Sequence, residues 1–105
     1  MIKWKGKADF KLAVREVAKE LKVKVGTVYI RSMSNKWASI TSDGKRLYFN
    51  SDLLEMRKEL GHFVIVHELI HLKVPNHGKL FKSLMSTYVK GYEKLEEELK
   101  YGRQD

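Results

Sequence analysis

The 105-residue chain contains no cysteine. This absence excludes a disulfide scaffold, a thiolate metal site and a cysteine nucleophile, so any bound metal must be held by nitrogen or oxygen ligands. Long apolar runs are also missing, since the longest, Phe63 to Val66, is far shorter than the roughly 20 residues of a membrane-spanning helix. The basic N-terminus has no apolar stretch behind it, so no secretory signal is predicted. We therefore expect a cytoplasmic protein without a membrane partner.

Acidic residues are the scarcer charge, with 13 Asp and Glu against 21 Lys and Arg and a formal net charge of +8. Most of the basic residues are lysines, and they are scattered along the chain. Nucleic-acid binding is better indicated by arginines interleaved with exposed aromatics, so this pattern favours a solvated, lysine-rich surface and no nucleic-acid partner is expected. Abundant Lys and Glu beside a single Gln also resemble the composition of thermophile proteins.

A chain of 105 residues, 43% of them hydrophobic, is long enough for one core, so residues 1–105 are expected to form a single domain. In the first half, apolar residues recur at helical spacing between Phe10 and Leu21, which predicts a helix with Asp9 as its N-cap. The Asp43-Gly44 pair predicts a hairpin turn. Alternating patterns predict a small, mainly antiparallel sheet with strands at residues 27–33, 37–41 and 46–50.

The second half of the chain is predicted to be helical. One helix is expected to begin between residues 53 and 57 and to end near Leu72, and Pro75 then prevents its continuation. Asn76 is the expected N-cap of a following C-terminal helix. The apolar stripe of that helix consists of Leu80, Phe81, Leu84, Tyr88 and Tyr92. A helix, a small sheet and further helices in this order indicate the α+β class.

The second half also contains the run His67-Glu68-Leu69-Ile70-His71, an HExxH motif on a predicted helix. Residues four apart in an α-helix lie about 40° apart around the axis and one turn apart along it, so both imidazoles can reach one zinc ion. Glu68 is rotated by about 100° from His67, which places its carboxylate beside a zinc-activated water rather than on the metal. We therefore predict that Glu68 is the general base of a hydrolase.

A catalytic zinc site usually has three protein ligands and an open position, and His77 is the third candidate. It follows His71 by six residues, past the turn at Pro75, so the chain can double back and bring it to the first pair. The remaining histidine, His62, is predicted to face another side of the helix and to be structural or exposed. An HExxH would arise by chance in this composition on the order of one time in a hundred, so one catalytic Zn²⁺ is favoured over core histidines.

The stretch from His67 to Phe81, together with residues 37–40 and 47–50, resembles the minigluzincins and the related YgjP-like metallopeptidase domains, over roughly residues 28–99. The resemblance implies a minimal zincin fold, with HExxH on an active-site helix, and a zinc metallopeptidase acting on peptides or proteins. In minigluzincins the third ligand is histidine where most gluzincins use glutamate, which fits His77. The metzincins share only the ligand spacing, because they carry glycine where this chain has Val74 and their later Met-turn has no room here.

The resemblance implies two further features. Residues 37–40 would be an edge strand at the rim of the cleft that binds substrate by strand addition; the alternative is an ordinary core strand with Trp37 buried. Residues 91–105 would cover the cleft and keep the enzyme latent, in a monomer or in a dimer formed through this segment; the alternative is a solvated terminal helix. The carboxylates that would approach the zinc are those of Glu96, Glu97, Glu98 and Asp105.

Two other functions stay open at this level. A zinc-bearing module that binds nucleic acid or a protein partner would use the positive charge and would not need Glu68. A zinc hydrolase of a non-peptide substrate would need Glu68 with a different cleft. The group that stabilises the oxyanion is open as well. Its candidates are Tyr48, Tyr88, Tyr92 and Tyr101.

Overall fold

The computed structural model describes the backbone of residues 2–102 and the side chains of residues 2–100, in which four α-helices accompany three strands. This composition confirms the predicted α+β class. In chain order the elements are α1 (Lys7–Leu21), β1 (Thr27–Arg31), β2 (Ala38–Ile40), β3 (Arg46–Asn50), a 3₁₀ turn η1 (Ser51–Glu55), α2 (Lys58–Ile70), α3 (Lys79–Tyr88) and α4 (Tyr92–Gly102).

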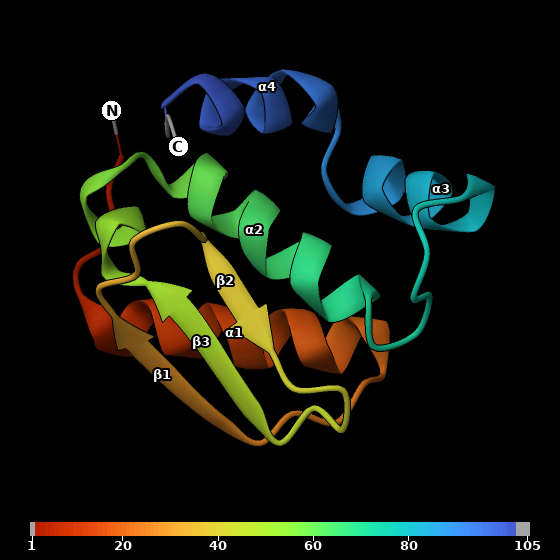
Figure 1. The fold of residues 1–105 in the computed structure, drawn as a ribbon, viewed down its shortest axis with the longest axis horizontal. Helices are drawn as coiled ribbons and strands as arrows, with labels where there is room; N and C mark the ends of the chain where they lie inside the picture. The colour runs from red at the N-terminus through yellow and green to blue at the C-terminus, as the bar shows by residue number, and fades with distance from the viewer. Residues whose placement is uncertain (1, 103–105) are drawn as a thin grey trace.

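The three strands form one sheet in the order β1-β3-β2 (Figure 1). β2 and β3 are antiparallel, as predicted, but β1 and β3 are parallel, with Val28 opposite Leu47. The sheet is therefore mixed rather than mainly antiparallel. β2 follows β1 in the chain, but the two strands lie on opposite edges of the sheet. The turn after β2 then places β3 between them. The first two strands are also shorter than predicted.

The turn between β2 and β3 forms at the predicted Asp43-Gly44 pair. The amide of Gly44 donates to the carbonyl of Thr41 at 2.8 Å, and Gly44 has a φ of 73°. Glycine adopts this left-handed conformation without steric cost. The Asp43 carboxylate accepts from the Lys45 amide and from the Thr41 hydroxyl, and these hydrogen bonds lower the pKa of Asp43. The turn sets the antiparallel register of β2 and β3, and β3 becomes the central strand because β1 pairs with its other edge.

The core lies between one face of the sheet and the helices α1 and α2. The predicted apolar stripe of α1 is buried, as are the inward residues of the two longer strands. The prediction that Asp9 caps α1 is wrong. The helix begins at Lys7, so Asp9 lies within its first turn, where it accepts a hydrogen bond from the Lys5 amide at 3.1 Å. A carboxylate there still interacts favourably with the helix dipole.

Helix α2 runs through the middle of the molecule and is apolar on almost every side. Its buried residues include Leu60, Val64 and Leu69, and it packs against α1, β2, α3 and α4. A helix that is buried on several faces is hydrophobic around its whole circumference. Gly61 allows the Trp4 ring to approach so closely that an added Cβ would lie 2.5 Å from its indole nitrogen. This burial holds the C-terminal end of α2 in a defined position.

The C-terminal part differs most from the prediction. The single helix expected after Pro75 is two helices, α3 and α4, separated at Gly91, which has a φ of 70°. Asn76 is not the N-cap of α3; its side chain instead accepts from the amide of Gly78, which occupies the cap position. Leu80, predicted to be part of a buried stripe, is 61% exposed. The break at Gly91 lets α4 turn back and lie along α2 (Figure 1).

Candidate functional site

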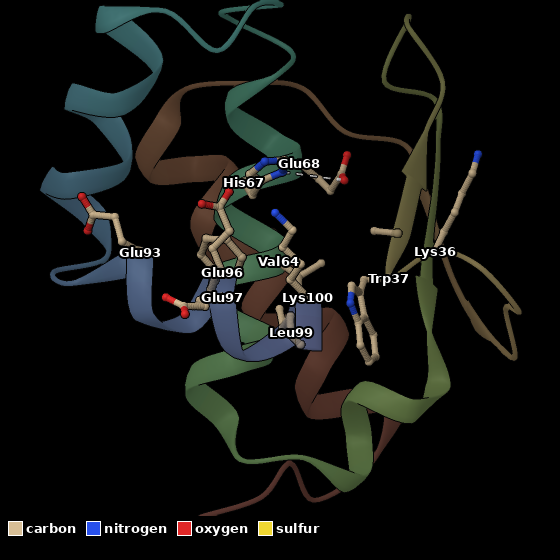
Figure 2. Close-up of a pocket in the computed structure, with 12 residues that line it drawn as sticks. Lys36, Trp37, Val64, His67, Glu68, Glu93, Glu96, Glu97, Leu99 and Lys100 are labelled. Atoms are coloured by element: carbon tan, nitrogen blue, oxygen red, sulfur yellow. Dashed lines mark ion pairs between the residues drawn. The ribbon is translucent and has the colours of Figure 1, made fainter. Parts of the chain in front are cut away.

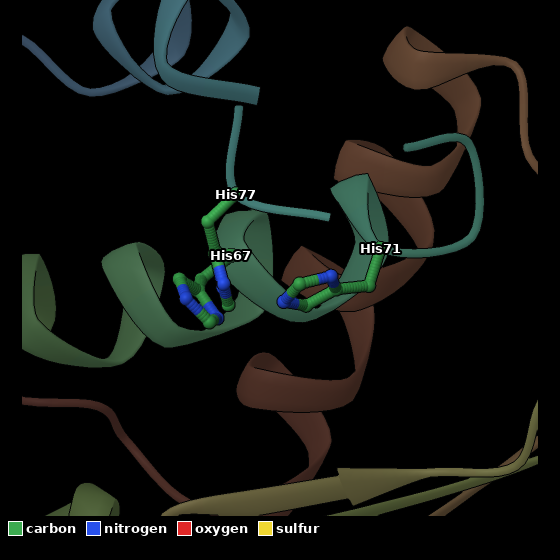
Figure 3. A group of neighbouring side chains, drawn as sticks. All are labelled: His67, His71 and His77. Atoms are coloured by element: carbon green, nitrogen blue, oxygen red, sulfur yellow. The ribbon is translucent and has the colours of Figure 1, made fainter. Parts of the chain in front are cut away.

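Three histidines meet at the C-terminal end of α2 (Figure 3). His67 lies in the last turn of α2, His71 is the C-cap residue of that helix, and His77 comes from the loop that precedes α3. One ring nitrogen from each lies within 4.8 Å of the others. The structure thus brings together the three residues that were predicted to hold a metal, and their donor atoms are close enough to share one ion.

The chain between His71 and His77 folds back over the end of α2. The amides of Lys73 and Val74 both donate to the carbonyl of Ile70, at 2.9 and 2.8 Å, which closes the helix end tightly. Pro75 then prevents further helix. This turn carries His77 back until its ring centroid lies 4.6 Å from that of His71 and 5.4 Å from that of His67.

Phe81 is the residue of the site that sequence reasoning overlooked. It lies in the first turns of α3, is 3% exposed, and its ring contacts all three imidazoles, with centroid distances of 5.2, 4.8 and 4.6 Å. The sequence did contain a signal for this role. Phe81 follows His77 by four residues at the start of a predicted helix, a spacing that brings the two side chains to neighbouring turns. A buried ring behind the imidazoles restricts their rotation, so it orients them from the apolar side.

The chemistry of the donor set suits zinc. Three imidazole nitrogens with no thiolate match the ligand set of catalytic zinc sites that leave one position open. The pKa of His71 is lowered, chiefly because burial disfavours the charged imidazolium and also because His67 lies beside it. A metal-ligating histidine must be neutral. The surroundings of His71 therefore favour the neutral form, which is the form that binds metal.

Glu68 lies beside this cluster. Its side chain is 20% exposed, and one carboxylate oxygen is 3.9 Å from Nδ1 of His67 (Figure 2). Two hollows meet at this residue. One, of about 850 Å³, extends along α2 between the start of β2 and α4; the other, of about 660 Å³, follows β2 past His71 to Pro75. Glu68 thus stands at the middle of a continuous cleft along the edge of the sheet.

β2 forms one wall of that cleft. The strand order places it at the edge of the sheet, as predicted for residues 37–40, and Trp37 is half-buried rather than part of the closed core. Trp37 accepts from the Asn50 amide, and the Thr41 amide donates to Arg46, so these residues pair with β3. Successive residues of a strand direct their backbone groups to opposite sides. Ala38 and Ile40 therefore present theirs toward the cleft.

α4 forms the opposite wall. Glu93, Glu96 and Glu97 line the larger hollow together with Leu99 (Figure 2), whose side chain is 3% exposed and belongs to the core. The ring of Tyr92 stacks on Phe63 of α2 at 6.5 Å. One side of α4 is therefore packed against α2, while its remaining side chains face solvent or the cleft. Asp105 lies outside the described residues.

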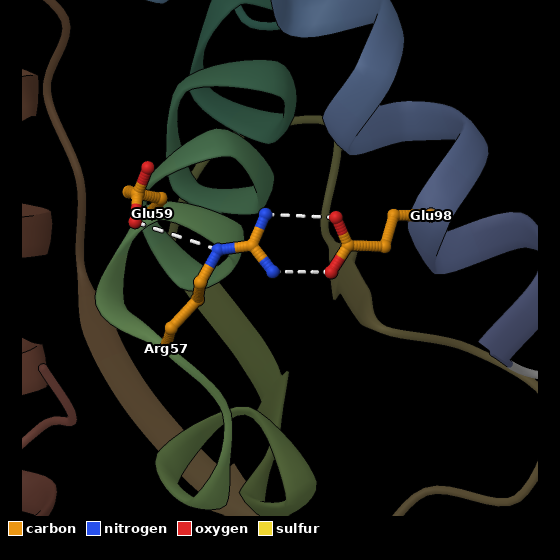
Figure 4. Close-up of polar contacts among 3 residues, drawn as sticks. All are labelled: Arg57, Glu59 and Glu98. Atoms are coloured by element: carbon orange, nitrogen blue, oxygen red, sulfur yellow. Dashed lines mark hydrogen bonds and ion pairs between the residues drawn. The ribbon is translucent and has the colours of Figure 1, made fainter. Parts of the chain in front are cut away.

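A charged contact joins α4 to the start of α2 (Figure 4). The guanidinium of Arg57 donates to both carboxylate oxygens of Glu98, at 2.7 Å from Nη2, and its Nε lies 3.4 Å from Glu59. The hydrogen bond to Arg57 lowers the pKa of Glu98, and the same contact raises the pKa of Arg57. Glu98 was expected to approach the metal; it is held by Arg57 instead.

The other candidates lie elsewhere. His62 is half-buried on α2 outside the histidine cluster, and burial lowers its pKa. Tyr48 belongs to the outer face of the sheet, and neither Tyr88 nor Tyr92 lines either hollow. The side chain of Tyr101 lies outside the described residues. Within the described part of the chain, no helix is long and apolar enough to cross a membrane.

Comparison with known proteins gives consistent results. The family model described as YgjP-like, metallopeptidase domain, matches residues 1–102. The protein MJ0123 of Methanocaldococcus jannaschii is 36% identical over 98 residues, which cover 90% of this chain and 89% of that protein. The crystal structure of the metallopeptidase zymogen of M. jannaschii jannalysin has a TM-score of 0.75 at 35% identity, covering 90% of this chain and 95% of that one. That of Pyrococcus abyssi abylysin has a TM-score of 0.75 at 17% identity, covering 89% and 93%, and shows the shared fold.

Proposed function

Since this chain belongs to the YgjP-like metallopeptidase domain family, we propose that it hydrolyses peptide bonds with one zinc ion held by His67, His71 and His77. Membership of a metallopeptidase family implies a metal ion. The observation that supports zinc at this place is the convergence of three imidazole donors within 4.8 Å of one another. The same cluster lies beside a carboxylate and opens onto a cleft bounded by an edge strand.

Glu68 is the proposed general base. When bound, zinc supplies a Lewis acid that polarises the scissile carbonyl and makes water acidic enough to lose a proton near neutral pH. The Glu68 carboxylate accepts that proton as the carbon–oxygen bond forms, and returns it to the amine as the carbon–nitrogen bond breaks. Its place at the junction of the two hollows suits this transfer, because it lies beside the His67 ring and remains partly open to the cleft.

The cleft favours an extended peptide as substrate. Ala38 and Ile40 present unpaired backbone groups on the side of β2 away from β3, and these can pair with a peptide lying between β2 and α2. Main-chain pairing of this kind binds many sequences. Side-chain preference would then depend on the hollows on either side of Glu68.

We further propose that α4 keeps the enzyme latent. Its residues form a wall of the larger hollow, close to His67 and Glu68, and are held there by the burial of Leu99 and by the Arg57–Glu98 pair. Jannalysin and abylysin, which this chain resembles in fold, were crystallised as metallopeptidase zymogens. Because α4 packs on α2 of its own chain, the proposed inhibition is intramolecular.

The test is hydrolysis of a quenched fluorescent peptide library by the zinc-loaded chain and by Glu68→Gln. Glutamine keeps the shape of the side chain and cannot accept the proton, so the rate should fall by about 10² to 10⁴-fold while zinc content stays at one ion per chain. If α4 makes the intact protein too slow to measure, a chain ending at Gly91 that keeps its circular dichroism serves as the second form. Cleavage that Glu68→Gln does not reduce would refute the proposed mechanism. Absence of cleavage in every folded, zinc-bound form would favour a non-peptide substrate.

A further inference from the structure

Within residues 2–102, no helix covers the face of the sheet turned away from the core. Figure 1 looks onto this face, with α1 lying behind the strands. In β1 the buried Val28 and Ile30 alternate with the exposed Thr27, Tyr29 and Arg31. In β3 the residues on this face are the exposed Arg46 and the half-buried Tyr48. We call the surface made by Tyr29, Arg31, Arg46 and Tyr48 the outer sheet face.

Two tyrosines from different strands stack on this face. Tyr29 and Tyr48 lie opposite each other in the parallel register, with ring centroids 5.1 Å apart and planes 16° from parallel. The guanidinium carbon of Arg31 lies 4.5 Å from the centroid of Tyr48. Tyr29 nevertheless remains 42% exposed. The face thus presents an aromatic ring to solvent next to a guanidinium that is itself stacked.

The charge of the face is of one sign. The three strands contain Arg31 and Arg46 and no acidic residue, and Lys45 directly precedes β3. Two acidic residues lie close to the strands along the chain. Asp43 accepts hydrogen bonds within the turn from the Lys45 amide and the Thr41 hydroxyl, and Asp52 lies in the first turn of η1, after the end of β3. Arginines beside exposed aromatic rings are typical of nucleic-acid-binding surfaces, whereas lysines scattered along the sequence are not.

We propose that the outer sheet face binds single-stranded nucleic acid. Sheet surfaces with exposed aromatics hold unpaired bases by stacking, and neighbouring cations hold the phosphates. Tyr29 offers the ring on which a base stacks, next to Tyr48, and Arg31 and Arg46 contact the backbone on either side. A duplex should bind this surface more weakly than a single strand, because its bases are already stacked and paired and do not reach the Tyr29 ring. The face lies apart from the histidine cluster, so binding is independent of Glu68.

The experiment measures fluorescence anisotropy of labelled ten-nucleotide oligo(dT) and oligo(U) with the full-length, zinc-loaded chain at several salt concentrations. The separate DNA and RNA arms show whether the sugar matters. Tyr29→Ala is expected to weaken binding by about 5- to 150-fold, whereas Tyr29→Phe, which keeps the stacking ring, should bind like the unaltered chain. Arg31→Gln should weaken binding and reduce the dependence of log affinity on log salt by roughly 0.7.

Lys11→Gln on α1 is the matched control, since it removes the same charge from an exposed position outside the sheet. It should change binding much less than Arg31→Gln. Glu68→Gln should bind normally, which separates this proposal from the peptidase proposal. Any of three results would overturn it: equal effects of Arg31→Gln and Lys11→Gln, equal affinity for a duplex of the same length, or competition by oligoglutamate as strong as by oligo(dT). Tyr29→Phe and Arg31→Gln change exposed side chains without shortening them to a methyl group, so the test does not depend on the alanine variant.

Discussion

Shortening Leu99 to alanine should release α4 and activate the peptidase. Leu99 is 3% exposed and anchors the last described turns of α4 in the core. Replacing a buried leucine by alanine costs about 2 to 5 kcal/mol. Because α4 follows Gly91 and packs mainly on α2, this cost falls on the attachment of α4 rather than on the sheet and α1.

The size of the activation follows from that cost. Every 1.4 kcal/mol changes an equilibrium tenfold, so a loss of about 2 kcal/mol increases the ratio of open to closed chains about 30-fold. While the open form is a minority, the rate of hydrolysis rises by the same factor. The gain levels off once most molecules are open.

The assay compares initial rates on the peptide library for zinc-loaded Leu99→Ala and for Leu80→Ala. Leu80 is the matched control, because it is also a helical leucine but is 61% exposed, so its shortening should leave the rate unchanged. Hydrogen exchange of the α4 amides monitors opening directly. If Leu99→Ala exposes the α4 amides to exchange and the rate does not rise, α4 does not restrain activity and the reasoning fails.

Three further changes test the site and its surroundings. His77→Ala should weaken zinc binding by more than about 100-fold in a calorimetric titration, because losing a ligand should cost more than losing a residue that only orients one. It should also remove most of the rise in Tm that zinc causes. An unchanged affinity would exclude His77 as a ligand. Arg57 lowers the pKa of Glu98, so this ion pair attaches α4 fully above about pH 4.3 and is lost as the pH falls through the lowered pKa. Hydrogen exchange of the α4 amides should therefore increase at that low pH, and also in high salt. Glu98→Gln, which has no charge to lose, should show neither response. Burial lowers the pKa of His62, so His62 takes up a proton at a higher pH in the unfolded chain than in the folded one, and the stability of zinc-free protein should increase with pH up to about 6.5. His62→Gln should reduce this slope of Tm against pH, measured between pH 5 and 7. An unaltered slope would assign the pH dependence to other groups.

Much of the candidate site could be predicted because it depends on local geometry. His67 and His71 are one helical turn apart, so the period of α2 brings their side chains together whatever surrounds the helix. The turn at Pro75 and the short distance to His77 leave few places for the third imidazole. The same local reasoning identified α1, β3 and the Asp43-Gly44 turn. It was less reliable for helix ends, because the side chains of Asp9 and Asn76 had other local partners than the cap position.

The helical HExxH, the approach of His77 to it and the α+β class were therefore all predictable from the chain, since periodicity and short spacing report contacts within a few residues. Which distant residues meet follows from the packing of the folded chain. The parallel pairing of β1 with β3, the stack of Tyr29 on Tyr48 and the contact of Arg57 with Glu98, 41 residues away, all depend on how separate elements pack. Such contacts leave no periodic trace, because each forms only after loop closure has brought its two segments together.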